Sequence, residues 1–182
     1  LKTVEFFNLG LMSKGTPFGI DWMIFMNKES KVLVLWGKSN SGKTDTIVQL
    51  INLLIDNECV IIKQSDHFKT SADKWCIIEF NGKKLGITTR GDDKESICSD
   101  FSEINDYIKK TNSNIDIYIC AAHGKGQTVK FLESEFTEKN IYWYAKSRLN
   151  IGTGKLCNDF YSIENKNQAL GILNILKRII CL

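Results

Sequence analysis

One segment constrains the fold of this chain more than any other: an apolar run, a glycine-rich turn and an amphipathic segment follow one another without a break. Residues 31–36 are almost all apolar, as in strands that are buried on both faces of a parallel sheet. Residues 44–55 then repeat apolar side chains at helical spacing, namely Ile47, Leu50, Ile51, Leu54 and Ile55. A buried strand that turns directly into an amphipathic helix is typical of α/β proteins with a mainly parallel sheet.

The rest of the chain alternates between strand-like and helix-like segments. Further strands are predicted at 59–63, 75–80, 84–89, 115–122 and 141–145, and helices at 94–110, 129–136 and 165–182. Asn81-Gly82 predicts an antiparallel hairpin between two of the strands, because both residues tolerate positive φ. Residues 146–163 show no clear period and are predicted to form a loop or lid. The expected fold is an α/β three-layer sandwich with a mainly parallel sheet and one antiparallel hairpin.

The chain has 182 residues, the length of one ordinary domain. We assign this domain to residues 26–182. Residues 1–25 are treated as an N-terminal extension, either additional sequence upstream of the domain or a genuine N-terminal hairpin or arm. The composition, 43% hydrophobic and 25% charged, predicts a substantial core.

Composition and charge argue against several partners. No run of about 20 apolar residues is present, so no membrane partner is expected. A net charge of +3 is too small to indicate nucleic-acid binding. The six cysteines include no Cys-x-x-Cys pair, so neither a zinc site nor a disulfide framework is predicted. Free thiols suit the reducing cytoplasm, which is the expected location.

The glycine-rich turn matches the Walker A pattern at every fixed position from Gly37 to Thr44. A turn of this length can wrap its backbone N–H groups around a β-phosphate, and the helix start adds unpaired N–H groups and the positive end of its dipole. We predict that Lys43 contacts the β- and γ-phosphates and that the Thr44 hydroxyl binds Mg²⁺. The predicted nucleotide-binding residues are Gly37, Lys38, Ser39, Asn40, Ser41, Gly42, Lys43, Thr44 and Asp45.

The turn and its flanking segments resemble the P-loop NTPase superfamily. A wider pattern resembles a group of small, poorly characterised ATP-binding P-loop proteins. It consists of the hairpin at 75–89, then Arg90-Gly91-Asp92, then the strand at 115–122 followed by His123-Gly124-Lys125-Gly126-Gln127-Thr128. This resemblance spans residues 30–145. It implies the P-loop NTPase fold and binding of ATP with Mg²⁺, and it implies no particular reaction.

A P-loop site usually includes an acid at the end of a neighbouring strand, which holds Mg²⁺ through water. Asp92, or its neighbour Asp93, is the best candidate, because a strand that ends in a glycine-aspartate turn is similar in layout to the strand before the second switch of small GTPases. Those proteins carry Asp-x-x-Gly, which is absent here, and the alternative is that the two aspartates cap the helix at 94–110. Asp116 is a weaker candidate, since it begins a strand. Thr44 and Asp92 are therefore the predicted metal ligands.

Other charged residues are candidates for the chemistry. Arg90 and Arg148 would either neutralise charge on a transferred phosphoryl group or form surface ion pairs. His123 is a candidate to contact a substrate at the end of its strand. Asp66 is either a solvated loop acid or a general base, since it follows a strand as the base of uridine-kinase-like enzymes does. Lys43, Asp92 and Arg90 form the predicted catalytic set.

The expected nucleotide is ATP, with GTP as the alternative. The Asn-Lys-x-Asp motif of guanine-specific GTPases is absent, and the nearest string, Asn165-Lys166-Asn167-Gln168, is better explained as a helix cap. The favoured function is a Mg-dependent ATPase that acts as a switch or assembly factor. The alternatives are a kinase for nucleosides, nucleotides or similar small molecules, and a nucleotide-dependent binding module with little hydrolysis.

Overall fold

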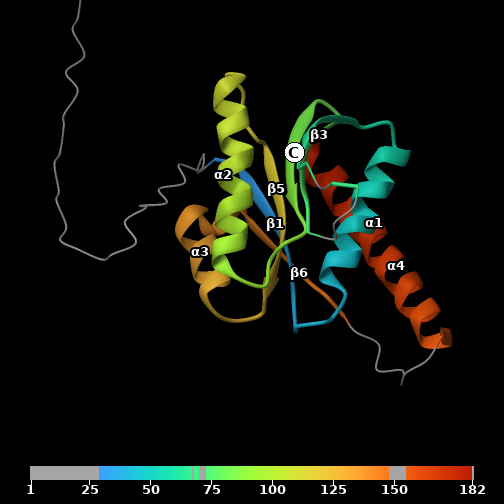
Figure 1. Cartoon of the computed structure of the whole chain (residues 1–182). Coiled ribbons are helices and arrows are strands. Elements are labelled where there is room, and N and C mark those ends of the chain that lie inside the picture. Colours follow the sequence, from blue (N-terminus) through green and yellow to red (C-terminus); the bar gives the residue numbers. More distant parts are fainter. Residues whose placement is uncertain (1–28, 67, 70–72, 148–154, 182) are drawn as a thin grey trace, which may run out of the picture.

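The computed structural model, which describes residues 29–66, 68–69, 73–147 and 155–181, contains a sheet with helices on both faces (Figure 1). Its six strands lie in the order β2-β3-β4-β5-β1-β6. The strands are β1 (Lys31–Gly37), β2 (Val60–Gln64), β3 (Trp75–Phe80), β4 (Lys83–Thr88), β5 (Ile117–His123) and β6 (Ile141–Ala145). The helices are α1 (Lys43–Asp56), α2 (Lys94–Lys110), α3 (Gln127–Glu135) and α4 (Lys155–Ile180), with a 3₁₀ turn, η1, at Glu138–Asn140.

The sheet is mostly parallel, as the alternation of strands and helices predicts. β1 pairs in parallel with β5 on one side and with β6 on the other, and β4 pairs in parallel with β5. β3 runs in the opposite direction and pairs antiparallel with both β2 and β4. The chain turns between β3 and β4 at Asn81 (φ 51°) and Gly82 (φ 72°). The hairpin predicted from Asn-Gly is therefore confirmed.

Two hydrophobic cores lie on opposite faces of the sheet, because successive strand residues point to opposite sides. Leu33 and Leu35 of β1 belong to the core that includes α1 and α4, whereas Val32 and Val34 belong to the core that includes α2 and α3. All four side chains are fully buried, which explains why this strand is apolar throughout. Figure 1 shows the same layering, with α1 and α4 on one side of the sheet and α2 and α3 on the other.

The largest departure from expectation is the start of the last helix. α4 begins at Lys155, ten residues before the predicted start at Asn165, so the loop or lid predicted at 146–163 is wrong for residues 155–163. The apolar spacing of a helix that packs on the core is absent there, because the apolar residues Phe160 and Ile163 are 47% and 56% exposed. Residues 148–154 and the predicted extension at 1–25 lie outside the described residues.

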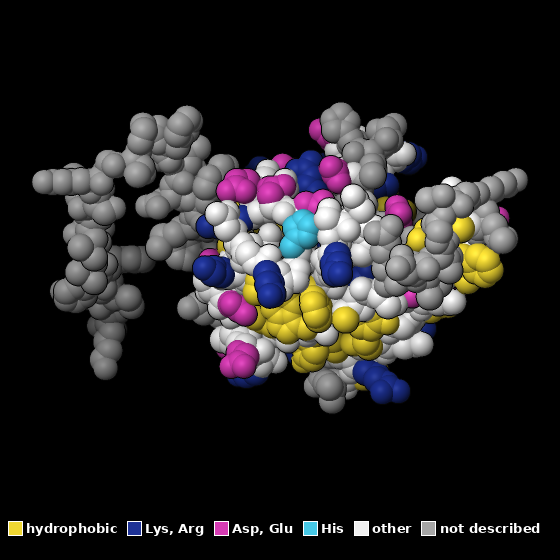
Figure 2. All heavy atoms as spheres, turned by 90° about the horizontal axis from the view of Figure 1, so that it is seen from below, with side chains coloured by type: hydrophobic (Ala, Val, Ile, Leu, Met, Phe, Trp, Pro, Cys, Tyr) yellow, Lys and Arg dark blue, Asp and Glu magenta, His cyan; other side chains and the backbone are white. Residues whose placement is uncertain are grey.

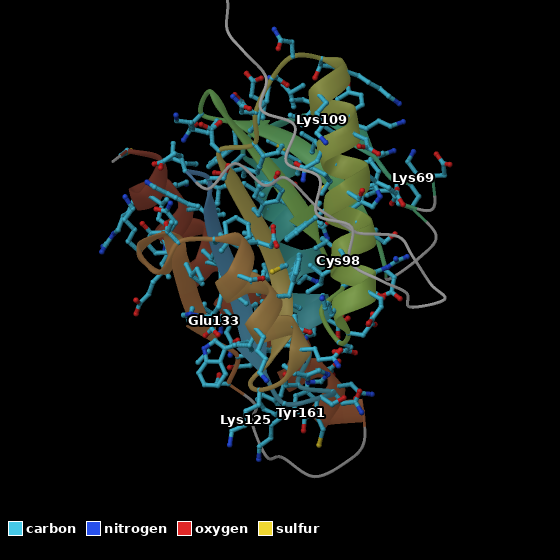
Figure 3. All side chains as sticks on the ribbon, turned by 90° about the vertical axis from the view of Figure 1, so that its left-hand side faces the viewer. Lys69, Cys98, Lys109, Lys125, Glu133 and Tyr161 are labelled. Carbon is cyan, nitrogen blue, oxygen red and sulfur yellow. The ribbon has the colours of Figure 1, made fainter. Side chains whose placement is uncertain are left out.

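β1, β4, β5 and β6 end at one edge of the sheet because they are parallel, and open α/β sheets bind ligands at this edge. Figure 3 shows Lys125, in the loop after β5, and Tyr161, in the first turns of α4, at this end of the molecule, with Lys109 toward the other end. Figure 2 views the molecule from this end, where lysine or arginine side chains lie next to a group of hydrophobic side chains. Trp36 and Trp143, on the neighbouring strands β1 and β6, are 38% and 41% exposed.

Candidate functional site

The turn between β1 and α1 has a backbone suited to anions. Gly42 adopts a left-handed conformation (φ 86°, ψ 23°) directly before α1, and Asn40 also has a positive φ of 54°. When residues in the left-handed backbone conformation alternate with right-handed ones, successive N–H groups point toward one side. Such concave arrangements bind anions. The N-cap residue of α1 is Gly42, which has no side chain that could cap the helix. The first N–H groups of α1 are therefore available to a ligand.

Lys43, the first residue of α1, folds back over this turn. Its Nζ donates to the carbonyl oxygen of Lys38 at 2.9 Å and to that of Gly37 at 3.4 Å, and the residue is only 5% exposed. Burial lowers the pKa of Lys43, and the nearby charge of Asp92 acts in the opposite direction. An ammonium that has lost much of its water interacts more strongly with a phosphate than an exposed one does.

Asp92 extends from the loop between β4 and α2 toward Lys43. Its Oδ1 lies 3.8 Å from Lys43 Nζ and 3.2 Å from Nε2 of His123, at the end of β5. The Asp92 side chain is 73% exposed, so these contacts add little to the stability of the fold. The structure thus brings together Lys43, Asp92 and His123, three side chains that the sequence marked as candidates.

The loop that carries Asp92 is held against β5 by close main-chain packing. A Cβ atom added to Gly91 would lie 2.2 Å from the carbonyl oxygen of Ala121. Ala121 N also donates to the carbonyl oxygen of Arg90 at 3.4 Å. Glycine is therefore required at position 91 for steric reasons.

Arg90 is paired with a buried acid of α2. Its Nη1 lies 3.3 Å from Oδ1 of Asp100. The other carboxylate oxygen of Asp100, Oδ2, accepts a hydrogen bond from the Thr88 hydroxyl. Asp100 is 2% exposed, and burial raises the pKa of its carboxyl group, while Thr88 and Arg90 act to lower it. Arg90 does not line the pocket described below, and its predicted catalytic role stays a prediction.

The two aspartates at the start of α2 have different roles. Asp93 is the N-cap, and its Oδ1 accepts a hydrogen bond from Ser96 N at 2.7 Å. Asp92 makes contact with Lys43 and His123 instead. The capping role weighed for both residues therefore applies to Asp93.

A pocket of about 590 Å³ opens beside the turn. One wall is formed by the turn and the first turns of α1, and another by the first turns of α4. Its lining residues are Asn40, Ser41, Gly42, Lys43, Thr44, Asp45, Val48, Gln49, Asp92, Asn158, Tyr161, Ser162 and Asn165. Gly37, Lys38 and Ser39, also predicted to bind nucleotide, are not part of this lining. The sequence did not mark Asn158, Tyr161 and Ser162, because residues 146–163 show no clear period and were expected to form a loop or lid.

Asn165 fixes α4 against the turn. Its Oδ1 accepts a hydrogen bond from the Thr46 hydroxyl at 3.3 Å, and a Cβ added to Gly42 would lie 2.8 Å from the same oxygen. Asn165 is 8% exposed and lies inside α4, not at its start. The interpretation of residues 165–168 as a helix cap is therefore wrong.

Lys146, directly after β6, is a second buried lysine beside the turn. Its backbone N donates to the carbonyl oxygen of Trp36 at 2.7 Å, and its Cβ would lie 3.1 Å from a Cβ added to Gly37. The residue is 8% exposed, and burial lowers the pKa of Lys146 while the charges of Glu164 and Asp45 act to raise it. No motif marked this residue. The sequence signal that could have identified Lys146 is its position directly after the strand β6.

The remaining predicted residues lie elsewhere. Asp66 lines a second pocket of about 360 Å³, together with Lys63, Gln64, Ser65, Trp75, Glu103, Asp106, Tyr107 and Lys110. Asp116 precedes β5, at the opposite edge of the sheet, and its Oδ1 pairs with Lys83 Nζ at 3.1 Å. Arg148 lies outside the described residues.

The pocket contains both predicted ligands for Mg²⁺, Thr44 and Asp92. Among the described residues, no group of three or more His, Cys, Asp or Glu side chains is placed to hold a metal ion. Mg²⁺ that arrives with a nucleotide needs few protein ligands, because phosphate oxygens and water supply the others. In addition, Ser41 Oγ is buried and has no hydrogen-bond partner within the described part of the chain. A phosphate oxygen would satisfy it, so this part of the turn fits a phosphate group.

Comparison with family models, with curated proteins and with solved structures finds no match to this chain. The site therefore has to be interpreted from its own geometry. Among the described helices, none combines the length and the apolar character that crossing a membrane requires.

Proposed function

We propose that this chain is a P-loop protein that binds a nucleoside triphosphate with Mg²⁺ and hydrolyses it as a switch or assembly factor. ATP is the expected nucleotide and GTP is the alternative. The observation that carries the proposal is the turn before α1. In this turn Asn40 and Gly42 have positive φ angles, the start of α1 has no side-chain cap, and Lys43 is buried. All three residues line the same pocket.

Each residue of the site has a defined task in this proposal. The backbone N–H groups of the turn and the Ser41 hydroxyl would donate hydrogen bonds to phosphate oxygens. Lys43 would exchange its two carbonyl partners for phosphate oxygens, which are stronger acceptors because they are charged. The Thr44 hydroxyl and Asp92 would hold Mg²⁺, which neutralises charge on the phosphates.

The contacts of Asp92 favour a switch. A γ-phosphate would compete with Asp92 for Lys43, whose Nζ lies 3.8 Å from Asp92 Oδ1. Asp92 belongs to the loop that joins β4 to α2, so a change of partner at this carboxylate acts directly on that loop. Ordering of a loop by a γ-phosphate is a common basis of nucleotide switches.

The kinase alternative has less support. Its predicted general base, Asp66, lines the second pocket, which shares no lining residue with the first. A general base must lie within hydrogen-bond reach of the acceptor hydroxyl, directly or through one water.

The proposal is tested by the melting temperature of the full chain with and without Mg-ATP. At a hundredfold excess of ligand over Kd, binding stabilises the folded state by about 2.7 kcal/mol. For a chain of this size, that corresponds to a rise of about 5–10 °C. Lys43→Ala should abolish the rise, because it removes the ammonium that faces the phosphates.

Lys125→Ala is the matched control, since this exposed lysine lies at the same end of the molecule and outside the pocket lining. It should keep the full rise. Phosphate release from ATP alone, slowed by Asp92→Asn, would support hydrolysis. An unchanged melting temperature of the wild-type protein with Mg-ATP and with Mg-GTP would refute nucleotide binding.

A further inference from the structure

The pocket beside the turn extends well beyond the residues that a phosphate chain would use. Val48 and Gln49 also line it, and Gln49 lies five residues after Thr44 along α1. At 1.5 Å per residue, the pocket follows α1 for about 7 Å past the end of the Walker A sequence. A volume of about 590 Å³ lies within the range of sites that enclose a whole small molecule, about 300–1,000 Å³.

The charges in this outer part of the pocket do not suit further phosphate. Asp45, in the first turn of α1, places an exposed carboxylate in the lining next to Thr44. A carboxylate repels phosphate and accepts hydrogen bonds from hydroxyl groups, as the acidic residue of dinucleotide sites does from a ribose. The outer part is therefore suited to an uncharged group that carries hydroxyls.

The wall that α4 contributes has the composition of a base-binding surface. Tyr161 supplies a half-buried aromatic ring, and Asn158 and Ser162 supply an amide and a hydroxyl from the same two turns of helix. Gln49 supplies a second amide from α1. Aromatic rings stack on nucleobases, and amides can both donate to and accept from the edge of a base.

This wall is fixed relative to the phosphate-binding turn. The buried Asn165 joins α4 to α1 through Thr46 and lies against Gly42. Ala169, Ile172, Leu173 and Leu176 of α4 then continue into the core that also holds Ile47, Leu50 and Leu54 of α1. The α4 side chains of the pocket are thus carried by a helix that is packed in place before any ligand arrives.

We infer that the first turns of α4 form a nucleoside subsite, in which Tyr161 stacks on the base, Asn158 and Gln49 contact its edge and Asp45 accepts from the sugar hydroxyls. This inference rests on the proposed function, because the subsite adjoins the phosphate-binding turn. It adds which residues recognise the nucleoside part of the nucleotide, and that inorganic polyphosphate therefore binds more weakly.

The test is calorimetric binding of Mg-ATP and of Mg-tripolyphosphate to the full chain. The wild-type protein should bind ATP more tightly than tripolyphosphate. Tyr161→Ala should weaken ATP binding about 5- to 150-fold, the range expected for loss of one base–aromatic stack, and leave tripolyphosphate binding unchanged. Tyr161→Phe should keep most of the affinity for ATP, because the ring is retained.

Phe160→Ala is the matched control, since Phe160 is the neighbouring aromatic residue of α4, is 47% exposed and does not line the pocket. It should leave both affinities unchanged. Equal affinity of the wild-type protein for ATP and tripolyphosphate, or equal effects of Tyr161→Ala on both, would overturn the subsite while leaving the phosphate site intact. If neither Mg-ATP nor Mg-tripolyphosphate binds, the proposed function itself is refuted.

Discussion

The pocket beside the Walker A turn and the pocket that contains Asp66 have similar side-chain charges and very different backbones. The pocket beside the Walker A turn is lined by two carboxylates and one ammonium, and the pocket beside β2 is lined by three carboxylates and two ammonium groups. Each thus has one more negative than positive side chain. The first pocket, however, borders the start of α1, whereas the second borders the later turns of α2.

Under the proposed function, this difference means that an anion site need not be rich in basic side chains. The start of α1 offers unpaired N–H groups and the positive end of the helix dipole, whereas N–H groups in the later turns of a helix are already bonded. The carboxylates in the first pocket are then suited to a metal ion and to hydroxyl groups. In the second pocket Glu103 already accepts a hydrogen bond from Trp75 Nε1 at 2.8 Å.

Among substitutions that border the two pockets, Gly42→Ala should have the largest effect on the fold. A non-glycine residue with left-handed φ costs about 1–2 kcal/mol, and the new Cβ would lie 2.8 Å from the buried Asn165 Oδ1. We expect a loss of about 3 kcal/mol in the free energy of unfolding, measured in urea. Gly82→Ala has a similar φ of 72° but no atom within 4 Å of the new Cβ, and it should cost only about 1 kcal/mol. Equal losses would show that α4 does not pack on the turn.

Arg90→Ala tests whether the ion pair between Arg90 and Asp100 stabilises the fold without contributing to ligand binding. Asp100, buried under this loop, would lose its ion pair with Arg90 and keep the hydrogen bond from Thr88. Because the Arg90 side chain is 37% exposed, we expect a loss of only about 1–2 kcal/mol in stability. The rise in melting temperature with Mg-ATP should persist, since Arg90 does not line the pocket. A variant of normal stability that binds ATP and has lost phosphate release would instead support the predicted catalytic arginine.

Substitution of Lys146 should have a smaller effect, which appears in the pH dependence of the free energy of unfolding. Burial lowers the pKa of Lys146 below its usual value of 10.5, so the unfolded chain binds this proton more tightly than the folded chain. Stability contributed by this group therefore rises as the pH rises from the lowered pKa toward 10.5. Urea unfolding at several alkaline pH values should show a gain in the wild-type protein relative to Lys146→Met. Lys139→Met, at an exposed lysine, controls for the loss of one charge. Parallel curves for wild type and Lys146→Met would contradict the burial of this ammonium.

The smallest effect is expected from Asp66→Asn. Asp66 is exposed and lines the second pocket, so neither the melting-temperature rise with Mg-ATP nor phosphate release should change. If this variant lost phosphoryl transfer to an added nucleoside, the two pockets would have to act together, and the kinase alternative would replace the ATPase.

Much of the fold was predictable because local signals and long-range packing agree. The apolar β1 is covered on both faces, and Asn81-Gly82 takes the positive φ angles that its residue types permit. The start of α4 was not predictable from apolar spacing, because its first turns face the pocket and the solvent instead of the core. Side chains that line a pocket or face solvent do not follow the apolar period that packing on the core imposes.

The site was predictable only where one short segment contains it. Residues from Gly37 to Thr44 are adjacent in sequence, so their pattern could be recognised without the fold. Lys146, Tyr161 and Asn165 reach the same place only through the pairing of β6 with β1 and the packing of α4 on α1. No local motif specifies such long-range contacts.

The contact between Gly91 and Ala121 has a consequence for how the site can evolve. The main chain that carries Asp92 lies against β5 because Gly91 packs directly on the main chain of Ala121. Substitutions of Asp92 or His123 can therefore change the two side chains without changing the spacing of the main chain that carries them. A substitution at Gly91 would do the reverse, since it would push the loop after β4 away from β5 and leave both side chains in the sequence.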